Sequence, residues 1–524
     1  MTIQFNISHA VAYGEELLLN IIVGDSAGHT TARIGMSTLD GELWTCHLDN
    51  VDAKANRHID YYFSVDSAGH EREREWTGLV HRLDLTLTRC ENMRVECVWN
   101  AVPTDTRPYT SAFAECLARH TAATPPRVAQ MRTLRLIVRA PHLRPGERLA
   151  VAGADRVMGA WDKDKAAAMT EHSACEWQAD INAGGLNADT ELQFVAVAAD
   201  GTTEWEAGGR RTLHNIRVKP GEALVCELCE ALFDRHTELP ARKTTTVAKL
   251  RTNGSFGVGD FGDLAALVSS TGETKAERMI VLPPVNDTVS THTDADATPY
   301  SVISVCALHP LLCDLRQLPP IADRTLRERM EALRLRLNAL PHTDYSATLA
   351  AKADYLHAIF CQEGDHIMRS SAYRRFFANN EHWLVPYAQY SYLRDAYTEP
   401  DFRHWPSHTE WTEAERGQLQ NQRTKAYKKL AFIYYVQFVL HTQLCGVHSI
   451  AREHGIVLAG DTTANVNPNG CDVWQSQDKV GSDEWWARRL AVMANYYDAC
   501  RVAQNVISRR RITESTRMWL ETFD

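Results

Sequence analysis

A short apolar strand that ends at two prolines constrains the fold of this chain more than any other segment. The strand runs over residues 278–282, and Pro283 and Pro284 end it before a polar loop over 285–288. A glycine-rich turn with acidic residues, 257–263, precedes it. Because α/β folds keep their active sites in loops at the carboxyl ends of buried strands, the segment predicts an α/β domain with a polar site after residue 282.

The chain from about residue 230 onward alternates long amphipathic helices with short apolar strands. Asp323 precedes a helix that Pro341 ends, with apolar residues spaced by four and three: Leu326, Met330, Leu333, Leu337 and Leu340. A long helix over about 425–454 stops at Gly455, and a strand over 456–461 then ends in Asp461. This order is typical of the βα units of a barrel, and it predicts such an α/β domain over residues 230–524.

The chain before residue 230 has the pattern of all-β structure. Short strands bounded by polar turns predict two β-sandwiches over 1–102 and 131–228, with a Pro-framed linker at 103–130. The two regions share a plan that suggests an internal repeat. Each has a tryptophan before a mid-domain turn (Trp44, Trp177), an aromatic strand (61–65, 192–197) and a Glu and Trp pair after the next turn (Glu75-Trp76, Trp205-Glu206).

Two tryptophans in the second β region predict a sugar-binding surface. Trp161 and Trp205 stand in turn-rich segments beside glycine and acidic residues. Exposed indoles on neighbouring loops form a flat platform for the C–H faces of sugars, and Glu206 would then take hydroxyl groups. The alternative is that these tryptophans belong to the sandwich core.

Composition narrows the range of functions. A net charge of -10 does not favour binding to nucleic acid, because the phosphate backbone is itself negative. No apolar stretch approaches 18 residues, and the amino terminus lacks a signal-peptide pattern, so we expect no membrane span. Thirteen cysteines without metal-ligand spacing indicate reduced thiols and a cytoplasmic location. His292, Asp294 and Asp296 are close together but favour a hydrogen-bonded loop over a metal site, so no metal or cofactor is expected.

Residues 131–228 resemble a family-20 carbohydrate-binding module, the starch-binding domain. The motif positions that carry the resemblance are Gly153, Gly159, Trp161-Asp162, Trp177, Phe194 and Trp205-Glu206. Residues 1–90 are similar to a second, eroded copy, in which Trp76 and the strand 59–65 match but the Gly-Asn-Trp loop has no counterpart. The resemblance implies starch binding by Trp161, Trp205 and Glu206, and it leaves binding by Trp76 open.

Residues from about 230 to 505 resemble the family-77 glycoside hydrolases, which are 4-α-glucanotransferases (amylomaltases or disproportionating enzymes). The branch with two tandem starch-binding modules fits best. The matching segments are Leu250-Arg251, 257–263, 282–288, His292-Thr293, Pro299-Tyr300, Ser304, Ala307, Pro310, 382–387, 392–395, 435–437, 455–461 and 472–474. The resemblance implies substrate binding by Tyr300, Ser304, Asp461 and Asp472, with Tyr300 stacked on the sugar at the cleavage point.

The same resemblance fails where the family keeps its chemistry. The family nucleophile stands in an Arg-apolar-Asp-His motif, whereas this chain has Arg501, Val502, Ala503 and Gln504. The acid/base glutamate has no counterpart before Asp524, and the substrate loop between Trp474 and Trp485 is reduced to residues 475–484. Asp498 is five residues away from the nucleophile position and is expected to face another direction. The resemblance therefore implies an incomplete (β/α)8 barrel with a helical insertion over residues 230–524, without an intact catalytic pair.

Three hypotheses remain at this point. The chain is a glucanotransferase by descent that is inactive alone, or active only with a complementing C-terminal polypeptide. Alternatively it is a pseudoenzyme or scaffold that binds starch, glycogen or maltooligosaccharides. The third possibility is the product of a broken reading frame, suggested by the Arg-rich tail over 502–524. In each case the expected partners are α-glucans, with neither nucleic acid nor membrane.

Overall fold

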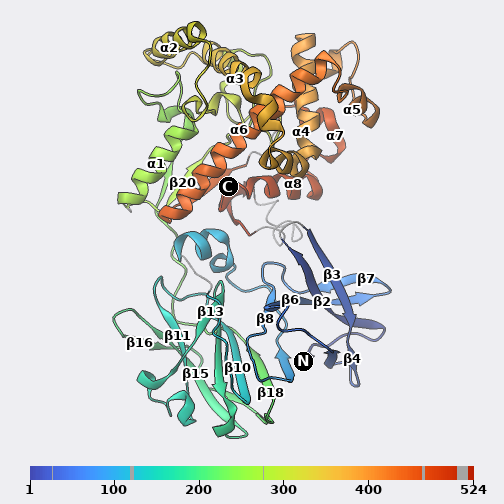
Figure 1. The fold of residues 1–524 in the computed structure, drawn as a ribbon, viewed down its shortest axis with the longest axis vertical. Coiled ribbons are helices and arrows are strands. Elements are labelled where there is room, and N and C mark those ends of the chain that lie inside the picture. The colour runs from blue at the N-terminus through green and yellow to red at the C-terminus, as the bar shows by residue number, and fades with distance from the viewer. Residues whose placement is uncertain (26–27, 119–122, 275, 463–465, 504–516, 524) are drawn as a thin grey trace. The chain divides into compact units, whose positions relative to one another are not determined.

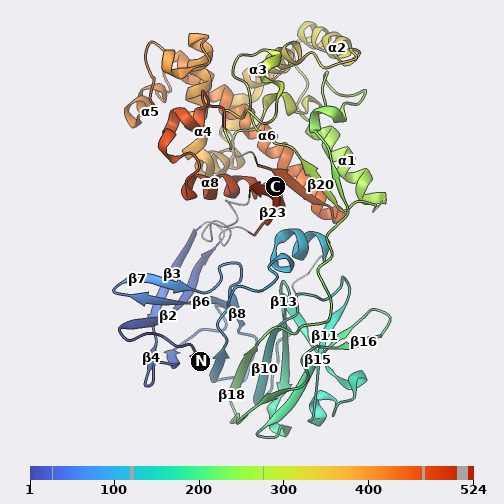
Figure 2. The ribbon, with the colours of Figure 1, turned by 180° about the vertical axis from the view of Figure 1, so that it is seen from behind.

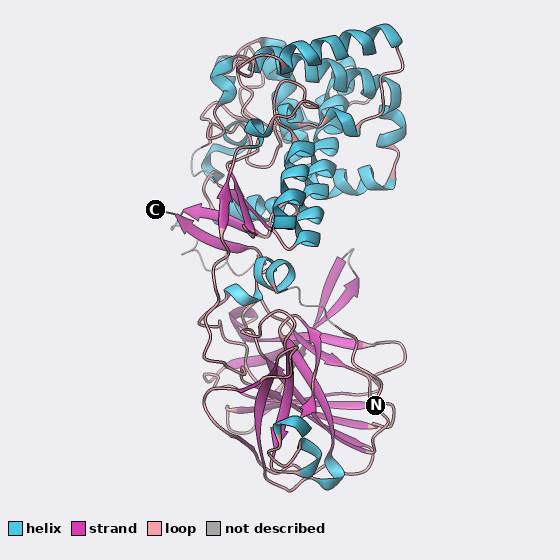
Figure 3. Ribbon diagram, turned by 90° about the vertical axis from the view of Figure 1, so that its left-hand side faces the viewer, coloured by secondary structure: helices cyan, strands magenta, loops and turns pink. Residues whose placement is uncertain are grey.

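The computed structural model describes residues 1–25, 28–118, 123–274, 276–462, 466–503 and 517–523. The chain divides into two compact units, Met1–Leu239 and Pro240–Asp524. The first unit consists mainly of strands and the second mainly of helices around a small sheet (Figures 1, 2 and 3).

The first unit contains two β modules of the same plan. The first module has strands β1 (Thr2–Ser8), β2 (Glu15–Asp25), β3 (Gly28–Gly35), β4 (Ser37–Thr38), β5 (Leu43–Leu48), β6 (His58–Ser67), β7 (His70–Arg74), β8 (His81–Asp84) and β9 (Asn92–Cys97). The second module has β10 (Arg132–Arg139), β11 (Arg148–Gly153), β12 (Ala167–Ala168), β13 (Thr170–Ser173), β14 (Glu176–Asn182), β15 (Thr190–Val197), β16 (Thr203–Trp205), β17 (Arg211–Leu213) and β18 (Glu222–Leu228).

One eight-stranded sheet runs through both modules. Its order is β13-β14-β10-β18-β9-β1-β5-β4, so the second half repeats the first in mirror order. The parallel pairing of β9 with β18, for example Val95 beside Val225, joins the halves. Each module adds a five-stranded sheet of its own, β3-β2-β6-β7 with β8 on β6, and β12-β11-β15-β16 with β17 on β15. The pairing of β9 and β18 covers an edge that each module would otherwise expose.

This shared sheet changes the expected division of the N-terminal half. The sequence predicts two separate sandwiches with a linker at 103–130, whereas the structure packs them as one unit. The linker region contains a short π-helix over Ala112–Leu117, and Phe113 in that helix is buried. An isolated bridge also pairs Leu87 with Val128. The segment packs on the β modules because its apolar side chains are removed from water there.

The second unit is built on a five-stranded parallel sheet in chain order. Its strands are β19 (Arg242–Thr244), β20 (Met279–Leu282), β21 (Val457–Asp461), β22 (Ala499–Ala503) and β23 (Trp519–Phe523). Helix α1 (Phe261–Thr274) connects β19 to β20, α6 (Lys425–His454) precedes β21, and α8 (Asp483–Met493) precedes β22. The βα alternation agrees with the sequence pattern, and closure into a barrel stays a prediction.

A helical insertion lies between β20 and β21, as the sequence predicts. It contains α2 (Arg324–Asn338), α3 (Tyr345–Met368), α4 (Ser371–Tyr397) and α5 (Glu413–Leu419) before α6, while the short α7 (Cys471–Ser476) follows β21. The predicted start of α2 is confirmed, because the carboxylate of Asp323 accepts a hydrogen bond from the Leu326 N–H at 2.8 Å. The predicted end of α6 is also confirmed, since Gly455 takes a left-handed φ of 67°.

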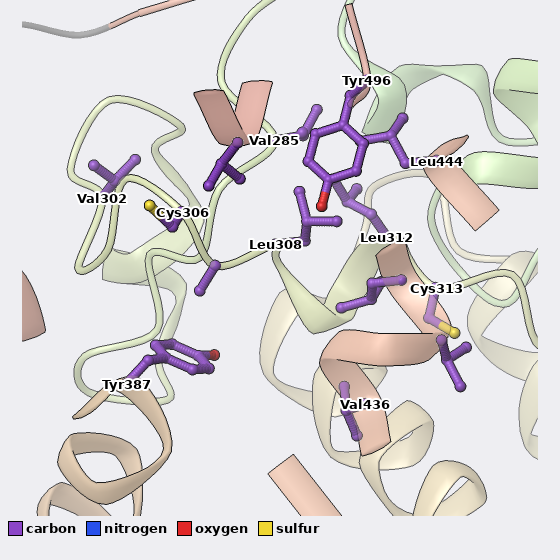
Figure 4. Packing of buried hydrophobic residues seen from close by; sticks show 14 of the residues in the cluster. Val285, Val302, Cys306, Leu308, Leu312, Cys313, Tyr387, Val436, Leu444 and Tyr496 are labelled. Carbon is purple, nitrogen blue, oxygen red and sulfur yellow. The ribbon is translucent and has the colours of Figure 1, made fainter. Parts of the chain in front are cut away.

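Helix α6 is the centre of the core of this unit. It is long and apolar enough to cross a membrane by length and composition, but 61% of its most apolar 18-residue window is buried inside the protein. Val436 and Leu444 of α6 belong to the same cluster as Leu308 and Leu312 of the loop after β20 (Figure 4). The amide of Gln437 also donates to the Leu308 carbonyl at 2.8 Å and accepts from its N–H at 2.9 Å. Burial in this core accounts for the apolar character of the helix.

Candidate functional site

The two tryptophans that are predicted to form a sugar platform are neighbours in the second module. The ring centroids of Trp161 and Trp205 are 6.4 Å apart, with an angle of 52° between the ring planes. Trp205 ends β16 and is 37% exposed. Trp161 follows Gly159 and Ala160 in a loop where all three residues have positive φ. A Cβ atom at Gly159 would lie 2.7 Å from the Asp162 carbonyl oxygen, so only glycine fits this turn.

Polar groups border this platform. The guanidinium of Arg210 stacks 4.1 Å above the Trp161 ring and forms an ion pair of 3.1 Å with Glu191. Gln193 donates its amide N–H to the Glu206 carbonyl at 3.1 Å. The second module therefore presents flat apolar rings beside donors and acceptors, which is the combination that recognises carbohydrate.

Glu206, predicted to take sugar hydroxyls, lies in the module interior instead. It is 3% exposed. Its Oε1 accepts from the Phe194 N–H at 2.9 Å and from Arg211 Nε at 3.1 Å, and its Oε2 accepts from Arg211 at 2.5 Å. Both oxygens are engaged, so the carboxylate positions β15 against β17 and is not offered to a ligand.

Trp76 of the first module does not correspond to Trp205. Strand pairing places Trp205 opposite Val195 and Arg74 opposite Ser64, so Arg74 is the residue at the position of Trp205. Trp76 is partly buried and packs edge-on against Tyr109 at 5.6 Å. The Glu and Trp pairs of the two modules have opposite order, so Trp76 is not the structural equivalent of Trp205, and a starch-binding role for Trp76 stays a prediction.

In the second unit, the predicted substrate residue Asp461 and its neighbour Arg501 meet at the carboxyl ends of adjacent strands. They are register partners on β21 and β22, with 3.8 Å between the Arg501 Nη1 and Asp461 Oδ2 atoms. Burial raises the pKa of Asp461, and Arg501 opposes that shift. Ala503 is two residues beyond Arg501, so its methyl group lies on the same face of the sheet. Gln504 lies outside the described residues.

Ser304 and Asp472 form a second group near these strand ends. Ser304 is buried, and Asp472, in the first turn of α7, accepts a hydrogen bond from the Val305 N–H at 2.9 Å. Burial raises the pKa of Asp472 to about 6, while the hydrogen bond from Val305 and the charge of Arg489 lower it. Tyr300 is 50% exposed on the loop just before Ser304, so its ring is available to a ligand.

Asp498 is excluded as a replacement nucleophile, as the sequence indicates. It is fully buried and directly precedes β22, at the amino end of that strand. Its Oδ2 is 2.8 Å from His448 Nε2, and its Oδ1 accepts from Arg452 at 2.6 Å. The site at the carboxyl strand ends lies at the opposite end of β22.

Arg489 is a buried charge that sequence reasoning missed. It lies on α8, fully buried against Trp485 and Trp486. Burial lowers its pKa, whereas the charges of Asp472 and Asp461 favour the guanidinium form. Its position between two acidic site residues is visible only in three dimensions, although an arginine within an apolar helix face is a signal that the sequence offers. Among the described residues, no group of three acidic, histidine or cysteine side chains could hold a metal ion.

Comparison with known families identifies both parts of the chain. The sequence profile of glycoside hydrolase family 77, described as 4-alpha-glucanotransferase, matches residues 245–484. The profile described as starch binding domain matches residues 133–219. This chain carries a family-77 domain and a starch-binding domain. The starch-binding domain includes Trp161 and Trp205, and the family-77 match includes Tyr300, Asp461 and Asp472. The match ends before Arg501 and Ala503.

Relatives of the family-77 domain have the same description. The chain is 25% identical to the 4-alpha-glucanotransferase DPE2 of Oryza sativa subsp. japonica over 404 residues, covering 70% of this chain and 42% of that protein. It is 25% identical to the 4-alpha-glucanotransferase of Chlamydia pneumoniae over 293 residues, covering 48% and 52%. The amylomaltase from Streptococcus agalactiae in complex with acarbose is 16% identical, with a TM-score of 0.42 and coverage of 51% and 59%. The chain spans about half the length of the curated relatives it matches.

Proposed function

We propose that this chain binds α-1,4-glucans through Trp161 and Trp205, and that it does not by itself transfer glucosyl units. The pair of neighbouring indoles carries the first part of the proposal: their ring centroids are 6.4 Å apart, Trp205 is 37% exposed and Trp161 is partly exposed. Hexose rings present C–H faces that stack on indoles, and Arg210 and Gln193 place polar groups beside them. The match of residues 133–219 to the starch-binding domain supports this ligand class.

The second part rests on the side chain at position 503. Retaining glycosidases use two carboxyl groups about 5–5.5 Å apart, one of which attacks the sugar. Ala503 is on the same sheet face as Arg501 and Asp461, two residues beyond the ion pair, and its methyl group cannot form a glycosyl-enzyme bond. Loss of a nucleophile typically lowers turnover by several powers of ten.

A second candidate function is a glucanotransferase completed by another polypeptide. The observation in its favour is that Asp461 and Arg501 are paired at the strand ends, where a substrate-facing pair of this family is expected. A complementing C-terminal polypeptide would then have to supply a nucleophile and an acid/base group.

Two measurements on the full-length chain test the proposal. Isothermal titration with β-cyclodextrin is expected to show binding that Trp161→Ala and Trp205→Ala each weaken by roughly 10- to 100-fold, because they remove central aromatic contacts. Incubation with maltotriose is expected to release no glucose above buffer. Affinity unchanged in both variants would refute the binding site, and steady glucose release by the chain alone would refute the loss of turnover.

A further inference from the structure

The first unit contains a cavity of about 460 Å³ that residues of both β modules line. We call it the junction pocket. Its walls come from the start of β6, from β8 and the residues that follow it, from β13, and from the segment that connects the two modules. Its charged lining residues are Arg57, Arg82, Asp84, Arg127 and His172. Asp84 is the only carboxylate among the described residues of this lining, so the pocket is positively charged.

Hydrogen bonds hold the walls of the junction pocket in place. The connecting segment is attached to the second module, because the Ala123 N–H donates to the Glu171 carbonyl at 2.8 Å. It is attached to the first module as well, because the Val128 N–H donates to the Thr86 carbonyl at 3.2 Å. The Thr86 hydroxyl in turn accepts from the fully buried Arg135 at 2.8 Å. The cavity is therefore preformed, as small-molecule sites usually are.

Three of the five charged lining residues have partners that neutralise them. The Arg82 guanidinium donates two hydrogen bonds of 2.8 Å to Asp60. His172 Nδ1 is 2.7 Å from Asp84 Oδ2. Burial lowers the pKa of His172, but Asp84 and Glu176 outweigh that effect and raise it to about 9, so the imidazole is protonated at pH 7. The carboxylate in the lining is thus already paired with a cation.

Arg57 and Arg127 are the two lining cations that are not neutralised. Both side chains are exposed, and neither guanidinium has a hydrogen bond or an ion pair within the part of the chain that the structure describes. Because both line the same cavity, their positive charges repel each other, and a bound anion would relieve that repulsion. A guanidinium group presents a planar fork of N–H donors that matches the oxygens of a phosphate group.

We propose that the junction pocket binds a dianionic phosphate group, either as free phosphate or as the monoester of a small organic molecule. A phosphate monoester carries a charge of about −1.5 to −2 at pH 7, which matches the two positive charges of Arg57 and Arg127. The cavity volume is within the range of about 300–1,000 Å³ that is typical of small-molecule sites, so it has room for the organic part of a monoester. This site is independent of the Trp161 and Trp205 platform and of the proposed function.

Calorimetric titration of the full-length chain, in a buffer without phosphate or sulfate, tests the ligand class. Inorganic phosphate and glycerol 3-phosphate are both expected to bind, whereas glycerol, which lacks the charge, is not. Tighter binding of glycerol 3-phosphate would assign an organic monoester as the ligand, and tighter binding of inorganic phosphate would assign the free ion. Binding of neither anion would overturn the proposal.

The two arginines allow matched variants, because both are exposed and their loss leaves the core of the unit intact. Arg57→Ala and Arg127→Ala are each expected to weaken the affinity for glycerol 3-phosphate by roughly 10-fold or more, since hydrogen bonds to a charged group are lost. Arg144→Ala, which changes an exposed arginine between β10 and β11 outside the pocket lining, is the control and is expected to leave the affinity unchanged. Unchanged affinity in both pocket variants would contradict the proposal.

A measurement on the wild-type chain does not depend on how the variants fold. Saturating glycerol 3-phosphate is expected to slow hydrogen–deuterium exchange over residues 53–58 and 123–128, with no change over residues 155–166 around Trp161. Slower exchange confined to 155–166 would place the anion outside the junction pocket and would overturn the inference. Binding of β-cyclodextrin, measured separately, tests the proposed function, so either proposal can fail while the other stands.

Discussion

The two β modules of the first unit share a frame and differ in the surface they present. Glu75 accepts a hydrogen bond from the Phe63 N–H at 2.7 Å, and Glu206 accepts one from the Phe194 N–H at 2.9 Å. Each glutamate also pairs with a cation, Glu75 with His81 and Glu206 with Arg211. The two cations have the same register position, because His81 is opposite Tyr61 and Arg211 is opposite Leu192. Each module therefore has the same buried motif, a glutamate that accepts a backbone N–H and pairs with a cation. Both modules keep it because buried polar groups must be hydrogen-bonded.

The surfaces differ where the strands end. In the second module β11 stops at Gly153, and the loop that follows carries Trp161. In the first module the equivalent strand β2 continues to Asp25 and pairs with β3 as a long hairpin. Arg74, at the position of Trp205, stacks 3.9 Å from the Tyr62 ring. Under the proposed function, glucan binding depends on loop and strand-end residues, while the buried glutamate with its backbone N–H and cation maintains the fold.

Removing the shared carboxylate is expected to have the largest effect. Glu206→Ala and Glu75→Ala should each lower the free energy of unfolding of the first unit by roughly 3–5 kcal/mol, because a backbone N–H and a cation, the partly buried Arg211 or the buried His81, lose their carboxylate partner. Urea unfolding followed by circular dichroism measures this. Glu71→Ala, at an exposed position on β7, is the control, with a change below about 0.5 kcal/mol. A loss below about 1 kcal/mol in either variant would show that the buried glutamate does not stabilise its β module.

His81 gives the first module a contribution to stability that depends on pH. Burial lowers the pKa of His81, but the buried Glu227 and Glu75 outweigh that effect and raise it to about 10. A pKa raised above the ordinary 6.5 means that protonation stabilises the fold fully below about pH 6.5, and that this contribution is lost as pH rises through 10.

We therefore expect the first unit to lose on the order of 3 kcal/mol of stability between pH 7 and pH 10. His172 adds to this loss of stability. Burial lowers its pKa, but Asp84 and Glu176 outweigh that effect and raise it to about 9. Urea unfolding at both pH values measures the change, and His81→Gln should flatten the pH dependence. Equal slopes in the variant and the wild type would mean that His81 is not the titrating group.

A third prediction concerns Trp205 and Arg74, which have the same register position. Trp205→Ala is expected to weaken β-cyclodextrin binding by roughly 10- to 100-fold, which corresponds to about 1.4–2.8 kcal/mol, since a central aromatic contact is lost. Arg74→Ala is expected to leave the affinity unchanged, because Arg74 covers Tyr62 in a module without the Trp161 loop. Calorimetric titration of both full-length variants decides the matter, and equal losses would show that both modules bind.

The smallest effect is expected at Trp76. Because its ring packs against Tyr109 and over Gly78, Trp76→Ala should change β-cyclodextrin affinity by less than about 2-fold while lowering thermal stability. The same titration and a thermal melt provide both values. A large loss of affinity with unchanged stability would restore Trp76 as a binding residue.

Local patterns in the sequence predict much of this fold because they have local causes. The Asp323 cap, the Gly455 stop and the apolar strand before Pro283 all appear where expected, since capping, left-handed turns and proline act over a few residues. The Trp161 and Trp205 platform is also found, because turn-rich tryptophans are rarely core residues in such contexts.

Features that depend on distant pairing could not be predicted. The junction of β9 with β18 joins residues about 130 positions apart and has no local signal. The alignment of Glu75-Trp76 with Trp205-Glu206 is shifted by one residue, and a one-residue shift reverses the side of a strand on which each side chain lies. Burial of Glu206 follows from that register, so composition alone assigns the wrong role to its carboxylate.

The central claim is that, of the two β modules, only the second binds α-glucan. Hydrogen–deuterium exchange of the full-length chain with saturating β-cyclodextrin tests it most directly. The account predicts protection of the Trp161 loop, residues 155–166, and of residues 203–210, with unchanged exchange over residues 58–76 of the first module. Protection over 58–76 with no change around Trp161 and Trp205 would contradict it.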